Sequence, residues 1–346
     1  MLISDTTIRE AAQEHGAKAN EWLRTDPAAV QQFRDAPGEV EFTADGTSVN
    51  TCEGWREMKV GIFSKRKRGE SATPDEWATR DLPKPLACLA FAAIEDSESF
   101  GARWKAWCKR LKLLDTSAIS VLADGAKWIW EEQRKHLTLA NGVLDIFHVL
   151  EHVTTAGKSL YQSVAAATAW ITHTRETLLA EGWTGLESFL KSAVTIDTTL
   201  VSKTAAAHES NLPTTAAVSP CPMPTEIFMP TAISATTDLL NSPPADTRPN
   251  TSTDPQLPLS PPAVFAPAAL ALRNYLAPHA QHLNYAERLA EGRSIGSGQI
   301  EGACKNLIGR RLKANSARWR VRRVNRMAGL CSLMYSDQWA PYWQTV

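Results

Sequence analysis

The chain has 346 residues, of which 37 are Lys or Arg and 37 are Asp or Glu, so its formal net charge at pH 7 is zero. Its apolar fraction of 43% and charged fraction of 21% are typical of globular proteins and exclude a fibrous or wholly disordered chain. The longest apolar run, residues 85–94, is shorter than the roughly 20 residues that cross a bilayer, and the six cysteines form no C-x-x-C pair. We therefore expect a cytoplasmic protein in a reducing compartment, with no membrane partner.

Periodicity and turn signals predict the secondary structure in chain order. A helix broken at Asp26-Pro27 is expected at 6–35. It is followed by strands 39–44, 48–52 and 57–63, helix 97–114, strand 118–123, helix 126–137, strand 143–147 and helix 148–180, and then by helices 269–291 and 299–312. Three strands in a meander followed by alternating helices and strands are the order of a ribonuclease H-like α/β fold, with a mixed sheet and flanking helices.

Residues 197–268 differ in composition from the rest of the chain. They contain 13 of the 20 prolines and no Gly, Trp or Tyr. Such sequence buries too little apolar surface to offset its ordering entropy, which predicts a disordered insert rich in Pro, Thr and Ser. The predicted organisation is a helical segment 1–37, the first part of a catalytic domain 38–150, a helical insertion 151–196, the low-complexity insert 197–268 and the last part of the catalytic domain 269–346.

Charge is distributed unevenly among these parts. Residues 1–196 carry 23 basic and 27 acidic side chains (net −4), the insert 2 and 6 (net −4), and residues 269–346 carry 12 and 4 (net +8). A segment that neutralises several phosphates gains affinity by releasing counterions, so the basic residues of 305–326 predict contacts with the DNA backbone. The predicted contacts are Lys305, Arg310, Arg311, Lys313, Arg318, Arg320, Arg322 and Arg323. The alternative is that these cations only offset the negative charge of the rest of the chain. Trp319 can stack or simply pack.

Two aspartates follow strands that are neighbours in the predicted sheet. Asp45 and Asp124 each precede a glycine, which lets the chain turn and exposes the carboxylate. Adjacent carboxylates repel, and a divalent cation between them relieves the repulsion. Glu301, after the break Gly296-Ser-Gly298, is the third candidate ligand. The alternatives are plain Asp-Gly hairpin turns and a helix-surface ion pair of Glu301 with Lys305.

Several segments together resemble the bacterial insertion-sequence transposases of the ISKra type, which are related to the Mutator-like DDE transposases. The segments that carry the resemblance are DGTSVNTCEGWREMKVG (45–61), VLADGAKWIW (121–130), GVLDIFHVLEHV (142–153), LNYAERLAEGRSIGSGQIEGACKNLIGRRLK (283–313), ARW (317–319) and WAPYW (339–343). The resemblance spans 38–196 and 274–346. Its most specific part is the GSG-x-x-E-x-ACK string.

The resemblance implies a metal-dependent enzyme of DNA transposition. Its catalytic triad is Asp45, Asp124 and Glu301, which bind two Mg²⁺ or Mn²⁺ ions, and a helical insertion separates the second acid from the third. Its partners are transposon ends and target DNA, on which it forms a homo-oligomer, and it associates with the nucleoid. Since only 44 residues precede Asp45, where the family carries a DNA-binding region, the resemblance also suggests an N-terminally shortened copy. The second interpretation is a catalytically inactive DNA-binding remnant or repressor.

The motif Asp145-x-x-His148 resembles the D-x-x-H motif of the Mutator-like enzymes. The resemblance implies that Asp145 and His148 pair and hold the edge of the site, and the alternative is a polar pair without a chemical role. The overlapping segment His148-Val-Leu-Glu151-His152 also fits H-x-x-E-H, in which two histidines on one helix face bind Zn²⁺. It leaves a zinc metalloprotease as a further alternative, with a third ligand among Glu176, Glu181 and Glu187.

Overall fold

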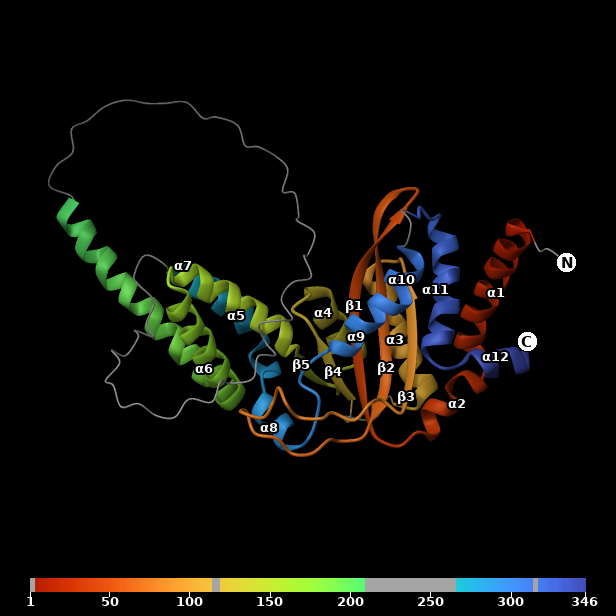
Figure 1. Ribbon diagram of the computed structural model, residues 1–346, viewed down its shortest axis with the longest axis horizontal. Coiled ribbons are helices and arrows are strands. Elements are labelled where there is room, and N and C mark those ends of the chain that lie inside the picture. Colours follow the sequence, from red (N-terminus) through yellow and green to blue (C-terminus); the bar gives the residue numbers. More distant parts are fainter. Residues whose placement is uncertain (1–3, 114–118, 209–265, 314–316) are drawn as a thin grey trace, which may run out of the picture.

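The computed structural model describes residues 4–113, 119–208, 266–313 and 317–346. A five-stranded sheet lies at the centre, in the order β3-β2-β1-β4-β5 (Figure 1). The strands are β1 (Glu39–Thr51), β2 (Gly54–Arg66), β3 (Ala87–Ala93), β4 (Ile119–Ala123) and β5 (Asn141–Leu144). The pairs β1–β2 and β2–β3 are antiparallel, whereas β1–β4 and β4–β5 are parallel. The mixed α/β class with a mixed sheet is confirmed.

The turn predicted at Asp45-Gly46 is wrong. β1 runs through both residues and pairs with β2 from Glu39↔Arg66 to Thr51↔Gly54, so the expected strands 39–44 and 48–52 are one strand. The third strand is β3, formed by the apolar run 85–94, and the expected strand 57–63 belongs to β2. Asp-Gly makes a hairpin turn only where its flanking segments pair with each other. Here both flanks pair continuously with β2.

Side chains along β1 alternate between the two faces of the sheet. Phe42 packs on one face against α3 (Ser97–Leu111). Val49 packs on the other, in a cluster with residues of α9 (Gly298–Ala303), η4 (Cys304–Gly309) and α11 (Val321–Tyr335). Asp45 lies an even number of residues from Val49 and so shares its face. The first candidate carboxylate therefore lies on the face covered by the helices that follow the second glycine break.

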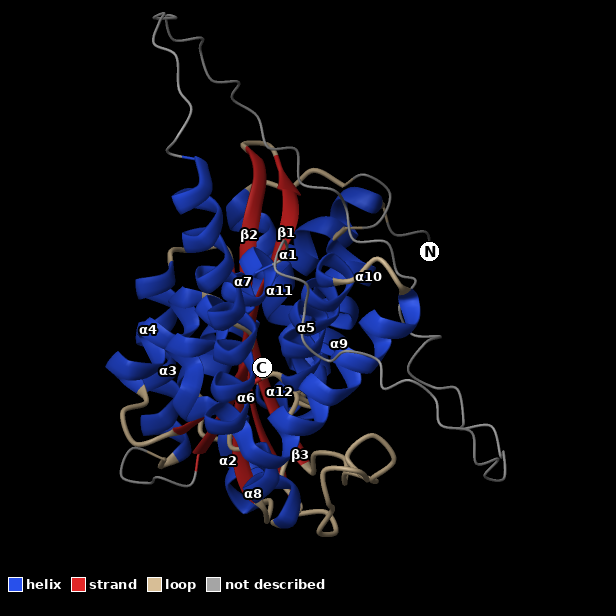
Figure 2. Ribbon diagram, turned by 90° about the vertical axis from the view of Figure 1, so that its left-hand side faces the viewer, coloured by secondary structure: helices blue, strands red, loops and turns tan. Residues whose placement is uncertain are grey.

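The other helices flank the sheet at its two sides. Figure 1 shows α1 (Asp5–Thr25), α2 (Ala28–Asp35) and α12 (Trp339–Thr345) beyond β3, and α5 (Ile146–Leu160), α6 (Val164–His208) and α7 (Ala266–Leu276) beyond β5. The turned view in Figure 2 shows the β1–β2 hairpin running along the length of the molecule. α4 (Lys127–His136) packs against α3. No helix in the described parts of the chain is long and apolar enough to cross a membrane.

Two expected helices are broken. The helix expected at 148–180 divides after Leu160 into α5 and α6, and α6 is itself kinked at Gly182 (φ 60°). The helix expected at 269–291 ends at Leu276. A 3₁₀ turn (Ala277–His282) follows, with Pro278 near its start, and precedes α8 (Tyr285–Ala290). Residues 197–208 of the expected insert belong to α6. Residues 209–265 of that insert lie outside the described residues.

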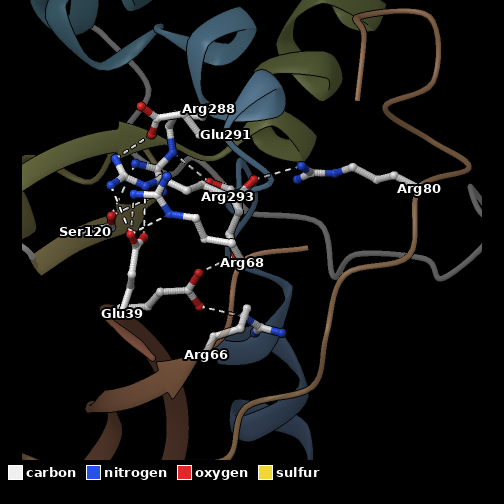
Figure 3. Close-up of polar contacts among 10 residues, drawn as sticks. Glu39, Arg66, Arg68, Arg80, Ser120, Arg288, Glu291 and Arg293 are labelled. Carbon is white, nitrogen blue, oxygen red and sulfur yellow. Dashed lines mark hydrogen bonds and ion pairs between the residues drawn. The ribbon is translucent and has the colours of Figure 1, made fainter. Parts of the chain in front are cut away.

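A buried polar network fastens the segment after α8 to the start of the parallel strands (Figure 3). The guanidinium of Arg288, which is 2% exposed, donates to the carbonyl of Ser294 at 2.8 Å and to the hydroxyl of Ser120 at 3.2 Å. Glu41 in turn accepts hydrogen bonds from Ser294 and from Arg66, the latter at 2.9 Å. These bonds fix where the chain enters the glycine break before α9.

Candidate functional site

Asp45 and Asp124 lie side by side where β1 and β4 part. Thr43 pairs with Leu122 in the parallel register, and β4 ends at Ala123, so Asp124 follows directly beside Asp45. Burial of the Asp45 carboxyl raises its pKa, and the negative charge of Asp124 raises it further. The structure therefore brings the two aspartates together, although Asp45 lies within a strand and not at its end.

Gly46 leaves room for a side chain of β2 to lie close to β1. A Cβ at this position would collide with the carboxylate of Glu57. Glu57 is held there by Lys59, whose buried ammonium lies 2.6 Å from its Oε2. The amide of Gly46 donates to Asp45 Oδ1 at 2.6 Å. The glycine that suggested a turn thus provides space and a hydrogen bond beside the first carboxylate.

Asp124 is held by the first turn of the helix that follows it. Its Oδ1 accepts a hydrogen bond from the amide of Ala126 at 2.9 Å, and its carbonyl accepts one from Trp130 Nε1 at 2.7 Å. Tyr275 from α7 covers Gly125 so closely that a Cβ there would lie 2.5 Å from the Tyr275 ring. Burial, followed by the charge of Asp124, raises the pKa of Tyr275 to about 12, so its phenol stays protonated at neutral pH.

Glu301 reaches the site from α9. Partial desolvation and the negative charge of Asp145 raise the pKa of Glu301, and the charge of Asp45 contributes to the same shift. Three residues further on, the Cys304 thiol donates to Asp45 Oδ2 at 3.5 Å, and burial raises the pKa of that thiol. Cys304 begins a π-helical turn, a distortion that is frequent at functional sites. The helix that carries the third carboxylate therefore contacts the first directly.

Asp145 lies outside the strand in which it was expected, and it does not pair with His148. β5 ends at Leu144, so Asp145 is the N-cap of α5, fully buried, and accepts a hydrogen bond from the amide of Phe147 at 2.6 Å. Its second oxygen accepts hydrogen bonds from both the amide, at 2.7 Å, and the hydroxyl of Ser297. His148 instead lies 3.5 Å from Glu151. Asp145 thus anchors the residue that immediately precedes the helix of Glu301.

The second histidine of the H-x-x-E-H motif packs by its ring face. His152 stacks on Tyr275 with 3.8 Å between ring centroids, and burial lowers its pKa. Within the described ranges, no group of three or more His, Cys, Asp or Glu side chains is arranged to hold a metal ion. The three acids Asp45, Asp124 and Glu301 supply carboxylate oxygens, the donors that suit Mg²⁺ and Mn²⁺. Burial is the main cause of the raised pKa values of Asp45 and Glu301, and neighbouring carboxylates add to both shifts.

A cavity of about 500 Å³ lies against β1 and the start of α9. Thr43, two residues before Asp45, lines it together with Phe147 and Gly298. Thr43 is 2% exposed, and its hydroxyl has no hydrogen-bond partner among the residues that the structure describes. Asp45, Asp124 and Glu301 are not among its lining residues, so the cavity lies beside the candidate site and not within it.

All eight basic residues predicted to contact DNA are exposed. Where the chain is described, none of them forms an ion pair with a carboxylate. Lys313 donates to the hydroxyl of Thr47 at 2.6 Å, and Trp319 forms backbone hydrogen bonds with Asn50 at 3.1 Å and Cys52 at 2.8 Å. Trp319 Nε1 also donates to the carbonyl of Leu312, so this ring packs and ties the basic segment to the end of β1.

Sequence reasoning missed two residues of the site. Cys304 lies three residues after Glu301, a spacing that places both side chains on neighbouring positions of one helix face. Tyr275 had no comparable signal, because it reaches Gly125 from a distant part of the chain. A comparison with protein-family models and with curated protein sequences finds no match to this chain.

Proposed function

We propose that this chain is a DDE-type DNA transposase built on a ribonuclease H-like catalytic domain. The observations that carry the proposal are that Asp45 and Asp124 lie side by side where β1 and β4 part, and that the charge of Asp45 acts on Glu301, which comes from a third part of the sequence. Two Mg²⁺ or Mn²⁺ ions bound there would activate water or a 3′-hydroxyl for attack on a phosphodiester. The reactions are DNA strand cleavage and transfer of the freed 3′-end to target DNA.

The surrounding residues position the site and its substrate. Asp145 fixes the start of the helix that bears Glu301, and the Cys304 thiol orients the Asp45 carboxylate. The exposed basic segment begins at Lys305, on the same helical stretch, and continues to Lys313, which donates to Thr47 within β1. Cations in this position hold the phosphate backbone without reading its sequence. Assembly into a homo-oligomer on the transposon ends belongs to the same proposal.

The test is Mg²⁺-dependent nicking and strand transfer on DNA that carries the element's ends. We expect Asp45→Asn, Asp124→Asn and Glu301→Gln each to reduce the rate by about 10³-fold or more, because each removes a metal ligand. Glu98→Gln, an exposed carboxylate on α3, is the matched control and retains the rate. Equal activity of the Asp124→Asn protein and the wild type would refute the assignment.

The second candidate is a DNA-binding protein without catalysis, which the exposed and unpaired cations favour. In that case the wild type and Asp124→Asn are equally inert with Mg²⁺ or Mn²⁺. Both still bind duplex DNA, with an affinity that falls steeply as salt increases. The nicking assay and the binding assay together therefore separate the two functions.

A further inference from the structure

α1 and α11 lie side by side next to the sheet (Figure 1), and residues of both line a groove. The two helices run in the same direction, since later residues of α1 contact later residues of α11. Gln13 donates to the carbonyl of Arg323 at 3.3 Å, and Asn20 donates to the carbonyl of Asn325 at 3.1 Å. They approach closely at Gly16, where a Cβ would lie 2.5 Å from a backbone oxygen of α11. Towards their first turns they leave a groove of about 660 Å³.

The α11 wall of this groove is entirely basic, whereas the α1 wall carries two basic and two acidic side chains. The basic lining residues are Arg9, Lys18, Arg320, Arg322, Arg323 and Arg326, and the acidic ones are Glu10 and Glu14. Glu14 is already paired with Lys18 at 2.7 Å. Among the described residues, none of the four arginines from the α11 side forms an ion pair. Their mutual repulsion is relieved by an anionic partner that lies along the groove.

The groove continues the basic segment of the candidate site. Arg320, Arg322 and Arg323 belong to both. Trp319, next to Arg320, is hydrogen-bonded to the end of β1, the strand that carries Asp45. A linear polyanion that follows Lys313, Arg318 and Arg320 away from the carboxylates therefore leads into the groove. The regular charge spacing of a nucleic-acid backbone fits such a path.

We propose that the groove between α1 and α11 binds the phosphate backbone of duplex DNA outside the region that is cleaved. The inference rests on the proposed function in taking DNA as the substrate. It adds α1, which carries no zinc-binding or helix-turn-helix pattern, to the DNA interface. α1 contributes Arg9 as the cation that faces the arginines of α11.

The experiment measures binding of the full chain to a labelled duplex by fluorescence anisotropy in EDTA, between about 50 and 300 mM salt. We expect Arg9→Gln and Arg322→Gln each to weaken binding several-fold and to reduce the slope of log K against log salt by about 0.9. Glu10→Gln should strengthen binding, which a folding defect does not do. Arg24→Gln, at the other end of α1 and outside the groove, is the control and leaves the affinity unchanged.

The proposal is overturned if Arg9→Gln and Glu10→Gln bind the duplex as Arg24→Gln does. It is also overturned if a polyglutamate peptide of equal charge displaces the duplex as effectively as unlabelled DNA, since the occupant is then an acidic protein segment. Because binding is measured without divalent ions, these results do not depend on catalysis. Failure of the nicking assay with intact groove binding would refute the transposase and leave the groove assignment standing.

Discussion

Individual carboxylates of the site reduce the stability of the metal-free fold. Asp45 is partly buried beside Asp124, and both its burial and that neighbouring charge raise its pKa. A raised carboxyl pKa means that the folded state holds the proton more tightly than the unfolded state. Stability is therefore greatest below the unfolded pKa and falls as the pH rises through the folded pKa.

This balance predicts that Asp45→Asn stabilises the protein at neutral pH in EDTA. The expected signature is a higher Tm, by roughly 2–4 °C for each kcal/mol released. The gain disappears below about pH 3.5, where the wild-type carboxyl is protonated in both states. Differential scanning calorimetry with and without Mg²⁺ checks it, since the ion should stabilise only the wild type. A lower Tm for Asp45→Asn at neutral pH would show that the hydrogen bonds from Gly46 and Cys304 dominate.

His282 provides a second pH dependence, of opposite sign. It stacks on Trp130 at 4.3 Å, and burial, followed by the charge of His279, lowers the pKa of His282 to about 4. The unfolded histidine binds a proton first as the pH falls, so stability is complete above about pH 6.5 and is lost down to about pH 4. We expect wild type to lose up to about 3 kcal/mol across this window.

His282→Phe keeps the stacking but cannot be protonated, so its unfolding free energy should depend much less on pH between about 4 and 6.5. Urea unfolding at a series of pH values measures the difference. His148→Phe, a half-exposed histidine on α5, serves as the control. Parallel pH profiles for wild type and His282→Phe would contradict the assigned cause.

At the scale of elements, the junction between α5 and α9 depends on one side chain. Asp145 caps α5 through Phe147 and holds Ser297 at the start of α9. Asp145→Ala leaves the amides of Phe147 and Ser297 without their acceptor and is expected to cost roughly 2–4 kcal/mol. Asp145→Asn keeps one acceptor oxygen and should cost less, and Ser297→Ala removes only the hydroxyl bond.

Hydrogen exchange locates the effect of these variants. In Asp145→Ala, the amides of Phe147 and Ser297 should lose protection before the amides of β1 do, because the change is local to the junction. If instead all three variants unfold at the same urea concentration as the wild type, Asp145 does not carry the junction.

The sequence predicted elements better than it predicted their ends. The apolar run Ile119–Ala123 has the length of a strand buried on both faces, and it forms β4. The parallel pairing of β4 with β1 places Asp124 beside β1. The Asp45-Gly46 turn failed because a dipeptide preference does not report which strand lies alongside. Residues of the site that come from distant segments were found only where a motif marked them. Glu301 had such a motif, whereas Tyr275 had none, since its contact with Gly125 depends on how α7 packs.

At the scale of the whole molecule, the buried network around Arg288 joins the segment after α8 to the first strands of the sheet (Figure 3). Burial lowers the pKa of Arg288 to about 10, so it remains charged at neutral pH. Arg288→Met leaves Ser294 and Ser120 without their donor and should cost roughly 3–5 kcal/mol. Arg293→Met breaks a more exposed pair with Glu39 and should cost about 1 kcal/mol or less.

Chemical denaturation of the two variants measures this difference, and high salt provides a further check. The contribution of Arg293 should shrink in 1 M NaCl, where exposed charges are screened within about 3 Å, whereas that of Arg288 should persist. Equal losses for the two variants would indicate that burial of Arg288 has no special role.

The helices that pack on the Asp45 face of the sheet also determine when the protein can fold during synthesis. Met58, Val60 and Ile62 of β2 pack in the cluster formed with α9, η4 and α11, all of which follow residue 297. While the ribosome is still translating the preceding segments, this apolar face has no cover and is open to chaperones or to aggregation. The same order of synthesis keeps Asp45 and Asp124 apart from Glu301 until late, so a nascent chain carries two of the three carboxylates without a completed site.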